Sequence, residues 1–192
     1  MSRIFPSYRE EVRLKILDIA WEVFISKGFR ESTMDDIAHS LGCSKGSLYN
    51  YFDNKEELLQ KAILSYVTNM NLELTNRFVK GDFVKNMEDY FTHEVSKTLL
   101  RRLSVLRIFL DTWEDKEIRS AFAAKFRGFD ETLAEIIETQ KKTGKIRADL
   151  DSRSAAERIH QLLLGIELSI AFGMEKEKAR VAWSDGVRAA IA

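Results

Sequence analysis

Residues 44–50 of the chain read SKGSLYN and bring several hydrogen-bonding groups into one short stretch. A lysine can donate to guanine O6 and N7, and a serine can bond to several bases. A tyrosine hydroxyl can bind a phosphate, and a glycine lets the backbone approach a ligand closely. The segment therefore carries the chemistry needed to read a DNA groove. The outward residues that we expect to do so are Ser44, Lys45, Gly46, Ser47, Tyr49 and Asn50.

Two short helices joined by a tight turn would position this segment as a helix-turn-helix. Gly42 falls at the turn, where a residue without Cβ tolerates positive φ. Ala38 is small at the place where the two helices touch. The positions that must face the rest of the domain carry Ile37, Leu41, Cys43, Leu48 and Tyr51. Because N-terminal residues of a recognition helix reach base edges in the major groove, this pattern predicts DNA recognition.

Two capping-box patterns mark the expected starts of neighbouring helices. Ser32 and Asp35 form the first pattern, and the second begins at Asn54. The free N–H groups at a helix N-terminus attract phosphate. We therefore add Thr33 and Lys55, which lie at these two starts, to the expected DNA contacts.

Residues 16–63 carry a dense set of short motifs. They are GF at 28–29, DIA at 36–38, LG at 41–42, SKGSLY at 44–49 and YF-x-NKEEL at 51–58. With these motifs the segment resembles the DNA-binding domain of the TetR family of regulators, although that family more often has an aliphatic residue at the position of Cys43. Residues 144–166 resemble, more loosely, the lead into the family's dimer-forming helix.

The resemblance implies an all-α protein with a three-helix helix-turn-helix domain at 1–54 and a helical effector-binding and dimerisation domain at 55–192. It implies a homodimer on a pseudo-palindromic double-stranded operator, with half-sites about 34–36 Å apart. A small-molecule effector in the C-terminal domain would shift the population away from the DNA-competent state. Members are mostly repressors.

Hydrophobic periodicity also predicts helix after helix and no strand. The single proline and the 9 glycines leave few helix breakers. Residues 103–113 are apolar on most sides, which predicts central burial of that stretch. The expected helices, about nine, cover approximately 7–26, 33–41, 45–51, 54–74, 82–100, 103–113, 114–144, 154–172 and 177–191.

The charge composition leaves the question of nucleic acid open, because Lys+Arg and Asp+Glu each number 30. The placement of residues must therefore support DNA binding. The single cysteine, Cys43, excludes an intramolecular disulfide and fits a reducing cytoplasm. We expect it to be a small core residue rather than a redox sensor. No apolar run is long enough for a membrane span, and no secretory signal is recognisable.

Nothing in the sequence predicts catalysis, a metal site or a cofactor. His39, His93 and His160 lie far apart, so we expect structural roles for all three. A helical enzyme or carrier that kept the fold is the rival from another class. A ligand-independent DNA-binding activator or accessory factor is the alternative regulator.

Aromatic and aliphatic residues on the helices that line the family's effector pocket suggest a hydrophobic or amphipathic effector. The expected lining is Tyr66, Met70, Leu106, Arg107, Phe109, Trp113, Phe122 and Phe126. Ordinary core packing is the alternative for each. Arg107 either pairs with Asp111 one turn later or binds an acidic ligand. Glu167 either anchors a ligand or pairs across a dimer, since a buried carboxylate needs a partner.

The last two expected helices are apolar on more than one face, which usually marks an interaction surface. We expect them to form a four-helix dimer interface in which Gly165 permits close approach. A purely monomeric core is the alternative. The interface residues expected are Ile159, Leu163, Ile166, Ile170, Trp183 and Val187.

Overall fold

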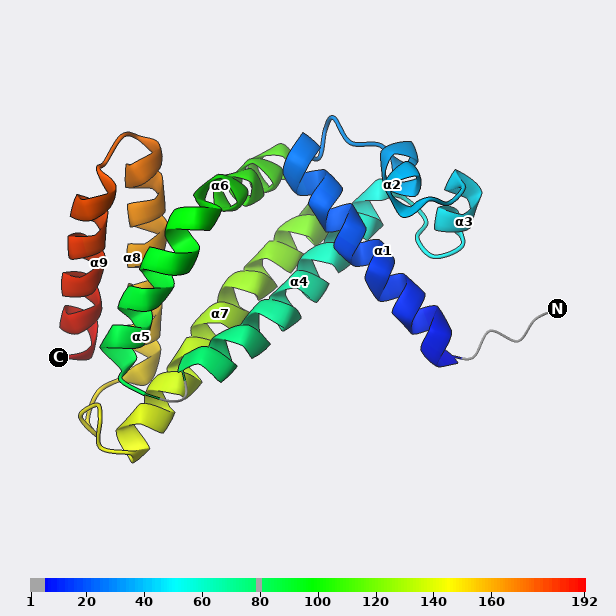
Figure 1. The fold of residues 1–192 in the computed structure, drawn as a ribbon. Helices are drawn as coiled ribbons and strands as arrows, with labels where there is room; N and C mark the ends of the chain where they lie inside the picture. Colours follow the sequence, from blue (N-terminus) through cyan, green and yellow to red (C-terminus); the bar gives the residue numbers. More distant parts are fainter. Residues whose placement is uncertain (1–5, 79–80) are drawn as a thin grey trace. The chain divides into compact units, whose positions relative to one another are not determined.

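The part of the chain that the structure describes consists of helices joined by loops (Figure 1). The computed structural model describes residues 6–78 and 81–192, and the side chains of 6–7, 67–74, 77 and 94–97 lie outside this description. No strand occurs among the described residues, which confirms the all-α prediction. The helices are α1 (Pro6–Lys27), α2 (Met34–Leu41), α3 (Lys45–Tyr49), α4 (Lys55–Phe78), α5 (Phe83–Tyr90), a π-helical turn η1 (Phe91–Val95), α6 (Ser96–Asp111), α7 (Lys116–Lys142), α8 (Ser152–Ala171) and α9 (Lys176–Ile191).

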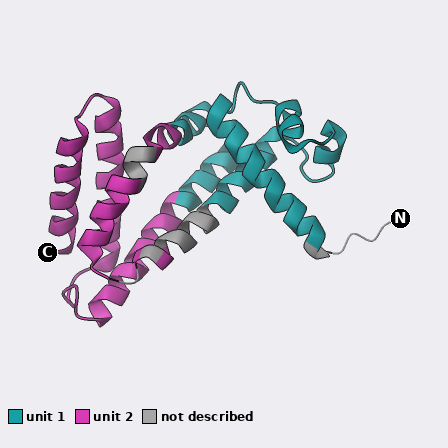
Figure 2. Cartoon of the chain, in the orientation of Figure 1, with its two compact units in different colours: residues 1–69, 104–125 teal, residues 70–103, 126–192 magenta. Residues whose placement is uncertain are grey.

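Two compact units make up the chain (Figure 2). Unit 1 contains residues 1–69 and 104–125, and unit 2 contains residues 70–103 and 126–192. Helices α4, α6 and α7 therefore contribute to both units. This division differs from the functional boundary expected between residues 54 and 55, which stays a prediction. Within the described ranges, no helix combines the length and the apolar character that crossing a membrane requires.

Unit 1 is organised around the buried face of α1. Ala20, Trp21 and Phe24 are buried at helical spacing on this face. They share one hydrophobic cluster with Ile37 of α2 and Leu48 of α3. Burying a large apolar side chain contributes about 1.5–3 kcal/mol, so this cluster fixes the two short helices on a rigid support.

Unit 2 is built around the pair α8 and α9, which pack side by side (Figure 1). Helix α8 begins after Asp151, whose side chain accepts hydrogen bonds from the backbone N–H groups of Arg153 and Ser154. Trp183 of α9 is buried and stacks on Phe91, with ring centroids 5.6 Å apart. The helix pair thus closes the hydrophobic core of its own unit.

The stretch 103–113 is not centrally buried, so that prediction is wrong. Its residues up to 111 belong to α6, a single helix that begins at Ser96 and carries charged residues on its first turns. Ile108 is buried in the core of unit 1, but Leu110 on the other side of the helix is 62% exposed. Leu106 and Trp113 are also exposed. The buried residues Ile108 and Thr112 lie one helical turn apart, so a single face of the stretch packs inward.

Candidate nucleic-acid interface

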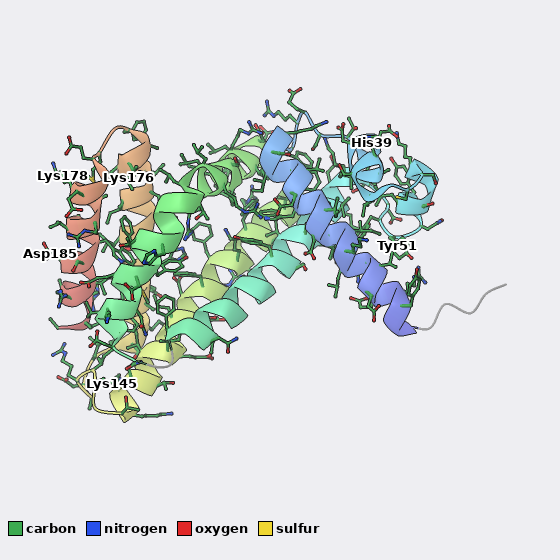
Figure 3. The ribbon with its side chains drawn as sticks, in the orientation of Figure 1. His39, Tyr51, Lys145, Lys176, Lys178 and Asp185 are labelled. Carbon is green, nitrogen blue, oxygen red and sulfur yellow. The ribbon has the colours of Figure 1, made fainter. Side chains whose placement is uncertain are left out.

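Helices α2 and α3 form the helix-turn-helix that the sequence predicts. Ile37 and Leu48 are fully buried in the core of unit 1. Gly42 lies at the turn with φ +68°, and its N–H donates to the carbonyl of His39 at 3.0 Å. Glycine suits this position because L residues rarely adopt such a φ. Figure 3 labels His39, which is exposed, and Tyr51, which is half-buried against the core.

Cys43 is exposed, which corrects its predicted role as a small core residue. Its backbone N–H donates to the carbonyl of Ala38 at 3.0 Å. The turn therefore uses the backbone of this residue while the thiol stays at the surface. Ala38 itself is buried where the two helices meet, as predicted.

The start of α2 is fixed by Thr33 and Asp36. The N–H of Asp36 donates to Thr33 Oγ1 at 3.1 Å, and the N–H of Thr33 donates to Asp36 Oδ2 at 2.9 Å. The capping box predicted one residue earlier, at Ser32 and Asp35, is wrong. Ser32 is buried, and its hydroxyl donates to the carbonyl of Phe29 at 2.9 Å.

Asp36 also accepts a hydrogen bond from Lys27. This bond, followed by those from Thr33, lowers the pKa of Asp36 from 3.8 to about 2. Because the folded-state pKa lies below the ordinary value, the ionised form stabilises the folded state above pH 3.8. That contribution is lost as the pH falls through about 2.

The first turn of α3 orders the residues expected to read DNA. Ser44 Oγ accepts the N–H of Ser47 at 3.2 Å, and the two hydroxyls are 2.8 Å apart. Lys45 Nζ donates to Oδ2 of Asp35 on α2 at 2.6 Å. This hydrogen bond from Lys45 to Asp35 raises the pKa of Lys45. The basic residue of the helix is thus held against α2 by a carboxylate.

Gly46, Tyr49 and Asn50 are exposed on α3 and at its C-terminal end. A Cβ added at Gly46 would meet only Ser44 Oγ, at 3.9 Å, so the protein itself does not require glycine there. Thr33 is exposed as well. These residues are accessible to a DNA duplex, and their contact with it remains a prediction.

Lys55, also expected to contact DNA, is half-buried and makes two contacts with backbone carbonyls of its own chain. Its ammonium donates to the carbonyls of Phe29 and Ser32, each at 2.8 Å. It also lies 4.3 Å from the centroid of the Phe29 ring. Lys55 therefore ties the start of α4 to the loop that precedes α2. No local pattern predicts these contacts, because the partners lie 26 and 23 residues away.

We expect Lys55→Met to lower the free energy of unfolding by about 1–2 kcal/mol, because the variant leaves two carbonyls without a charged donor. Urea denaturation followed by far-UV circular dichroism measures this. Lys15→Met, at an exposed position of α1, is the matched control and should change stability by less than about 0.5 kcal/mol.

The salt dependence of DNA binding separates the two roles of Lys55. A lysine that contacts phosphate contributes about 1 to the slope of log affinity against log salt concentration. If the salt slope of Lys55→Met stays at the wild-type value, Lys55 holds the loop before α2 and does not contact phosphate. A slope that falls by about 1, with unchanged stability, would contradict it.

The residues expected to line an effector site are divided between the two units. Six lie in unit 1, where Phe109 meets Trp113 and Phe122 edge-on, with centroids 5.2 Å apart in each pair. Phe126 lies in unit 2 and stacks on His160 at 5.0 Å. The side chain of Met70 lies outside the described residues. The effector site stays a prediction. The other expected lining residues, whose side chains the structure describes, are Tyr66, Leu106, Arg107, Phe109, Trp113, Phe122 and Phe126.

Arg107 lies against Gly28 at the end of α1. A Cβ added at Gly28 would fall 2.0 Å from Arg107 Nη2, and Gly28 has φ +87°. Asp111, the partner expected for Arg107, forms its ion pair with Arg30 at 3.3 Å. Both contacts attach α6 to the segment that leads into the helix-turn-helix.

Glu167 pairs with Arg102 of its own unit. The Nε–Oε1 distance is 3.1 Å, and Glu167 is only 7% exposed. Arg102 Nη2 also donates to the hydroxyl of Tyr90 at 2.7 Å. No local pattern points to Arg102, because its partner Glu167 is 65 positions further along the chain (167 minus 102).

Unit 2 contains a small apolar cavity, lined in part by Tyr90, with a volume of about 10 Å³. That is about the minimum needed for one water molecule, so a larger ligand would have to displace side chains. The cavity is lined by Phe78, Met87, Tyr90, Phe129, Leu133, Ile136, Ile159, Leu163 and Trp183.

Five of the six residues expected at a dimer interface are buried inside unit 2. They are Ile159, Leu163, Ile166, Trp183 and Val187, and the sixth, Ile170, is half-buried. A side chain buried within one chain has no area to offer a partner. The opposite face of α8 exposes Gly165 and Leu168, Phe172 is exposed directly after the end of α8, and α9 exposes Val181.

The sequence of the N-terminal part matches a known family. The family model described as "Bacterial regulatory proteins, tetR family" matches residues 16–62, which include α2, the turn at Gly42 and α3. Residues 16–62 therefore form a domain of the TetR family of regulatory proteins, and the resemblance seen in the motifs of residues 16–63 is confirmed.

Two curated relatives show how this TetR similarity is distributed. The HTH-type transcriptional regulator SrpR of Pseudomonas putida is 36% identical over 75 residues, which cover 39% of this chain and 35% of that protein. The HTH-type transcriptional regulator UidR of Escherichia coli K12 is 23% identical over 182 residues, which cover 95% and 92%. The similarity to SrpR thus covers a short stretch of this chain, whereas the weaker similarity to UidR covers almost all of it.

A solved structure shares the fold of almost the whole chain. The transcriptional regulator FadR of Bacillus subtilis, crystallised in complex with stearoyl-CoA, superposes with a TM-score of 0.69 at 20% sequence identity. The superposition covers 93% of this chain and 97% of FadR. At this identity the likeness establishes the fold alone.

Proposed function

We propose that the protein is a repressor that binds a pseudo-palindromic double-stranded operator as a dimer and is released by a small effector. Residues 1–54 would bind DNA, and residues 55–192 would bind the effector and dimerise. The observation that carries the proposal is the exposed polar surface of α3 on a buried scaffold. Ser44, Lys45, Ser47 and Tyr49 are exposed, whereas Leu48 of the same helix has no exposed surface.

This surface suits DNA because its groups match what a duplex presents. In the major groove guanine offers two acceptors to Lys45, and serine hydroxyls can bond to several bases. Tyr49 and Thr33 can bond to phosphates, which position the protein on the duplex. The rigid core beneath α3 keeps these groups at fixed positions, which sequence-specific reading requires.

Dimerisation is supported by the exposed apolar face of α8 and α9. Leu168 is 40% exposed, Phe172 89% and Val181 45%. Gly165, Leu168 and Phe172 recur at intervals of three and four residues, so they form one stripe along α8. A symmetric partner that presents the same stripe would cover it.

An effector of hydrophobic or amphipathic character is supported by the apolar composition of the C-terminal part. FadR, which shares the fold, was crystallised with stearoyl-CoA, an amphipathic molecule. In this chain Arg102 and Tyr90 place a cation and a hydroxyl at the edge of the apolar core of unit 2. An acidic or polar head group could replace one of their present contacts.

A gel-shift titration with the DNA that flanks the protein's own gene tests operator binding. We expect the wild type to bind this DNA at least about 1,000 times more tightly than random DNA. Lys45→Ala and Tyr49→Ala should each weaken binding about tenfold to a hundredfold, while Lys15→Ala on α1 should not. Equal affinity for both DNAs, with no effect of either variant, would refute DNA reading by α3.

A regulator without an effector is the second candidate, and the small size of the cavity found among the described side chains of unit 2 favours it. The cavity of about 10 Å³ has no room for a small molecule without rearrangement. Native mass spectrometry of the purified protein separates the two functions. A co-purified ligand that releases the operator supports the first, and a ligand-free protein that binds operator regardless of added hydrophobic compounds supports the second.

A further inference from the structure

The charged groups around the N-terminal end of α3 are arranged in pairs. Lys45 is the basic residue of the 44–50 segment, and its ammonium donates to Asp35 Oδ2 at 2.6 Å. Lys27 pairs in the same way with Asp36. Lys27 and Lys45 thus each have a carboxylate neighbour on α2, which partly neutralises the charge that they could present to DNA.

The two carboxylates differ in what else they do. Asp36 caps α2 through its bonds with Thr33, so it is part of the scaffold. Asp35 is exposed in the first turn of α2, and its described hydrogen bond is the one from Lys45. Asp35 can therefore be changed without removing the cap of the helix.

An ammonium has three N–H donors. While one of them binds Asp35, the other two can donate to O6 and N7 of a guanine. The carboxylate would then fix the direction of Lys45 and need not be displaced when a guanine lies at the right position.

Binding through phosphates alone is affected differently. Sequence-independent affinity comes from cations that neutralise phosphates and release counterions. A lysine already paired with a carboxylate contributes less to this term, and the exposed carboxylate itself repels phosphate. The pair should therefore disfavour random DNA more than a site with a guanine opposite Lys45.

We propose that Asp35 is a positioning residue for sequence discrimination: it directs the Lys45 ammonium toward a guanine and weakens binding that depends on phosphates alone. The inference rests on the proposed operator binding. Part of the sequence specificity is then controlled by an acidic residue on α2 and not by α3 alone.

Asp35→Asn tests the inference, because asparagine keeps the size of the side chain and removes its charge. The operator is a duplex selected by the wild-type protein from a random-sequence pool, and the reference is a scrambled duplex of equal length. Fluorescence anisotropy at several KCl concentrations gives both affinities. Glu31→Gln, at an exposed position in the loop before α2, is the matched control because it makes the same charge change.

We expect Asp35→Asn to raise the affinity for scrambled DNA about three- to tenfold, because Lys45 becomes available to a phosphate. For the same reason, the slope of log affinity against log salt concentration should become steeper by about 1. Affinity for the operator should rise less or fall, so the operator-to-scrambled ratio drops. Glu31→Gln should change both affinities by one common factor. In a Lys45→Met background, Asp35→Asn should no longer change the ratio, since the coupling requires both partners.

Two outcomes would overturn the inference. In the first, Asp35→Asn changes both affinities by one common factor, as Glu31→Gln does, and the operator-to-scrambled ratio stays at the wild-type value. In the second, the effect of Asp35→Asn on the ratio persists in the Lys45→Met background. A wild-type protein that selects no sequence from the pool would overturn operator binding and this inference together. Circular dichroism should confirm that the variants keep the wild-type helix content.

Discussion

Trp183→Ala is expected to lower the free energy of unfolding of unit 2 by about 3–5 kcal/mol. The side chain is buried, stacks on Phe91 and donates from Nε1 to the carbonyl of Met87 at 2.8 Å. Its removal adds a large void to a core that already contains a cavity of about 10 Å³. The same change leaves the Met87 carbonyl without its donor.

Urea denaturation followed by far-UV circular dichroism measures the loss, at several protein concentrations. Trp183→Phe, which keeps an aromatic ring and removes the hydrogen bond, should cost about 1–2 kcal/mol. Trp113→Ala is the matched control, because the same truncation at an exposed tryptophan should cost less than about 1 kcal/mol.

Trp183 was first expected at a dimer interface, and the experiment distinguishes that role from a core role. A core residue reduces stability by the same amount at every protein concentration. An interface residue would leave the single chain as stable as before and weaken only its association. Unchanged stability of Trp183→Ala would therefore contradict the packing described for unit 2.

Local signals made the helix-turn-helix predictable from sequence. Gly42 marks the turn, and Ile37 and Leu48 mark the buried side, because helix geometry alone relates these positions. The error of one residue at the start of α2 arose where two overlapping patterns are equally good. Ser32 and Thr33 can both cap a helix, and the burial of Ser32, a tertiary effect, decides between them.

Contacts between distant segments could not be predicted in the same way. The partners of Lys55 lie in the loop after α1, and the partner of Glu167 is Arg102 on α6. Helices α6 and α8 have apolar residues on more than one face, so periodicity does not say which face packs inward. That ambiguity led to both the predicted burial of residues 103–113 and the interface assigned to the inner face of α8.

The double variant Leu168→Asp/Phe172→Asp is expected to convert the proposed dimer into monomers. In a two-fold symmetric interface each substitution occurs twice, so four carboxylates would have to be desolvated close together. Both side chains are exposed in the single chain, 40% for Leu168 and 89% for Phe172, so the fold should keep its stability. The dissociation constant of the dimer should rise at least about a hundredfold, as measured by analytical ultracentrifugation.

Loss of the dimer should also weaken operator binding by about a hundredfold to ten-thousandfold, since each chain then binds one half-site without the help of the other. Leu110→Asp on α6 is the matched control, because it places the same charge at a residue that is 62% exposed outside the α8–α9 face. That variant should stay dimeric and bind operator normally.

The two readouts together decide how the exposed stripe on α8 works. Monomers that have lost operator affinity and kept wild-type stability place the interface on the outer face of α8 and make dimerisation a condition of DNA binding. A double variant that stays dimeric would exclude this face. Monomers that bind operator as tightly as the wild type would show that one helix-turn-helix suffices, and the pseudo-palindromic operator would then have no physical basis.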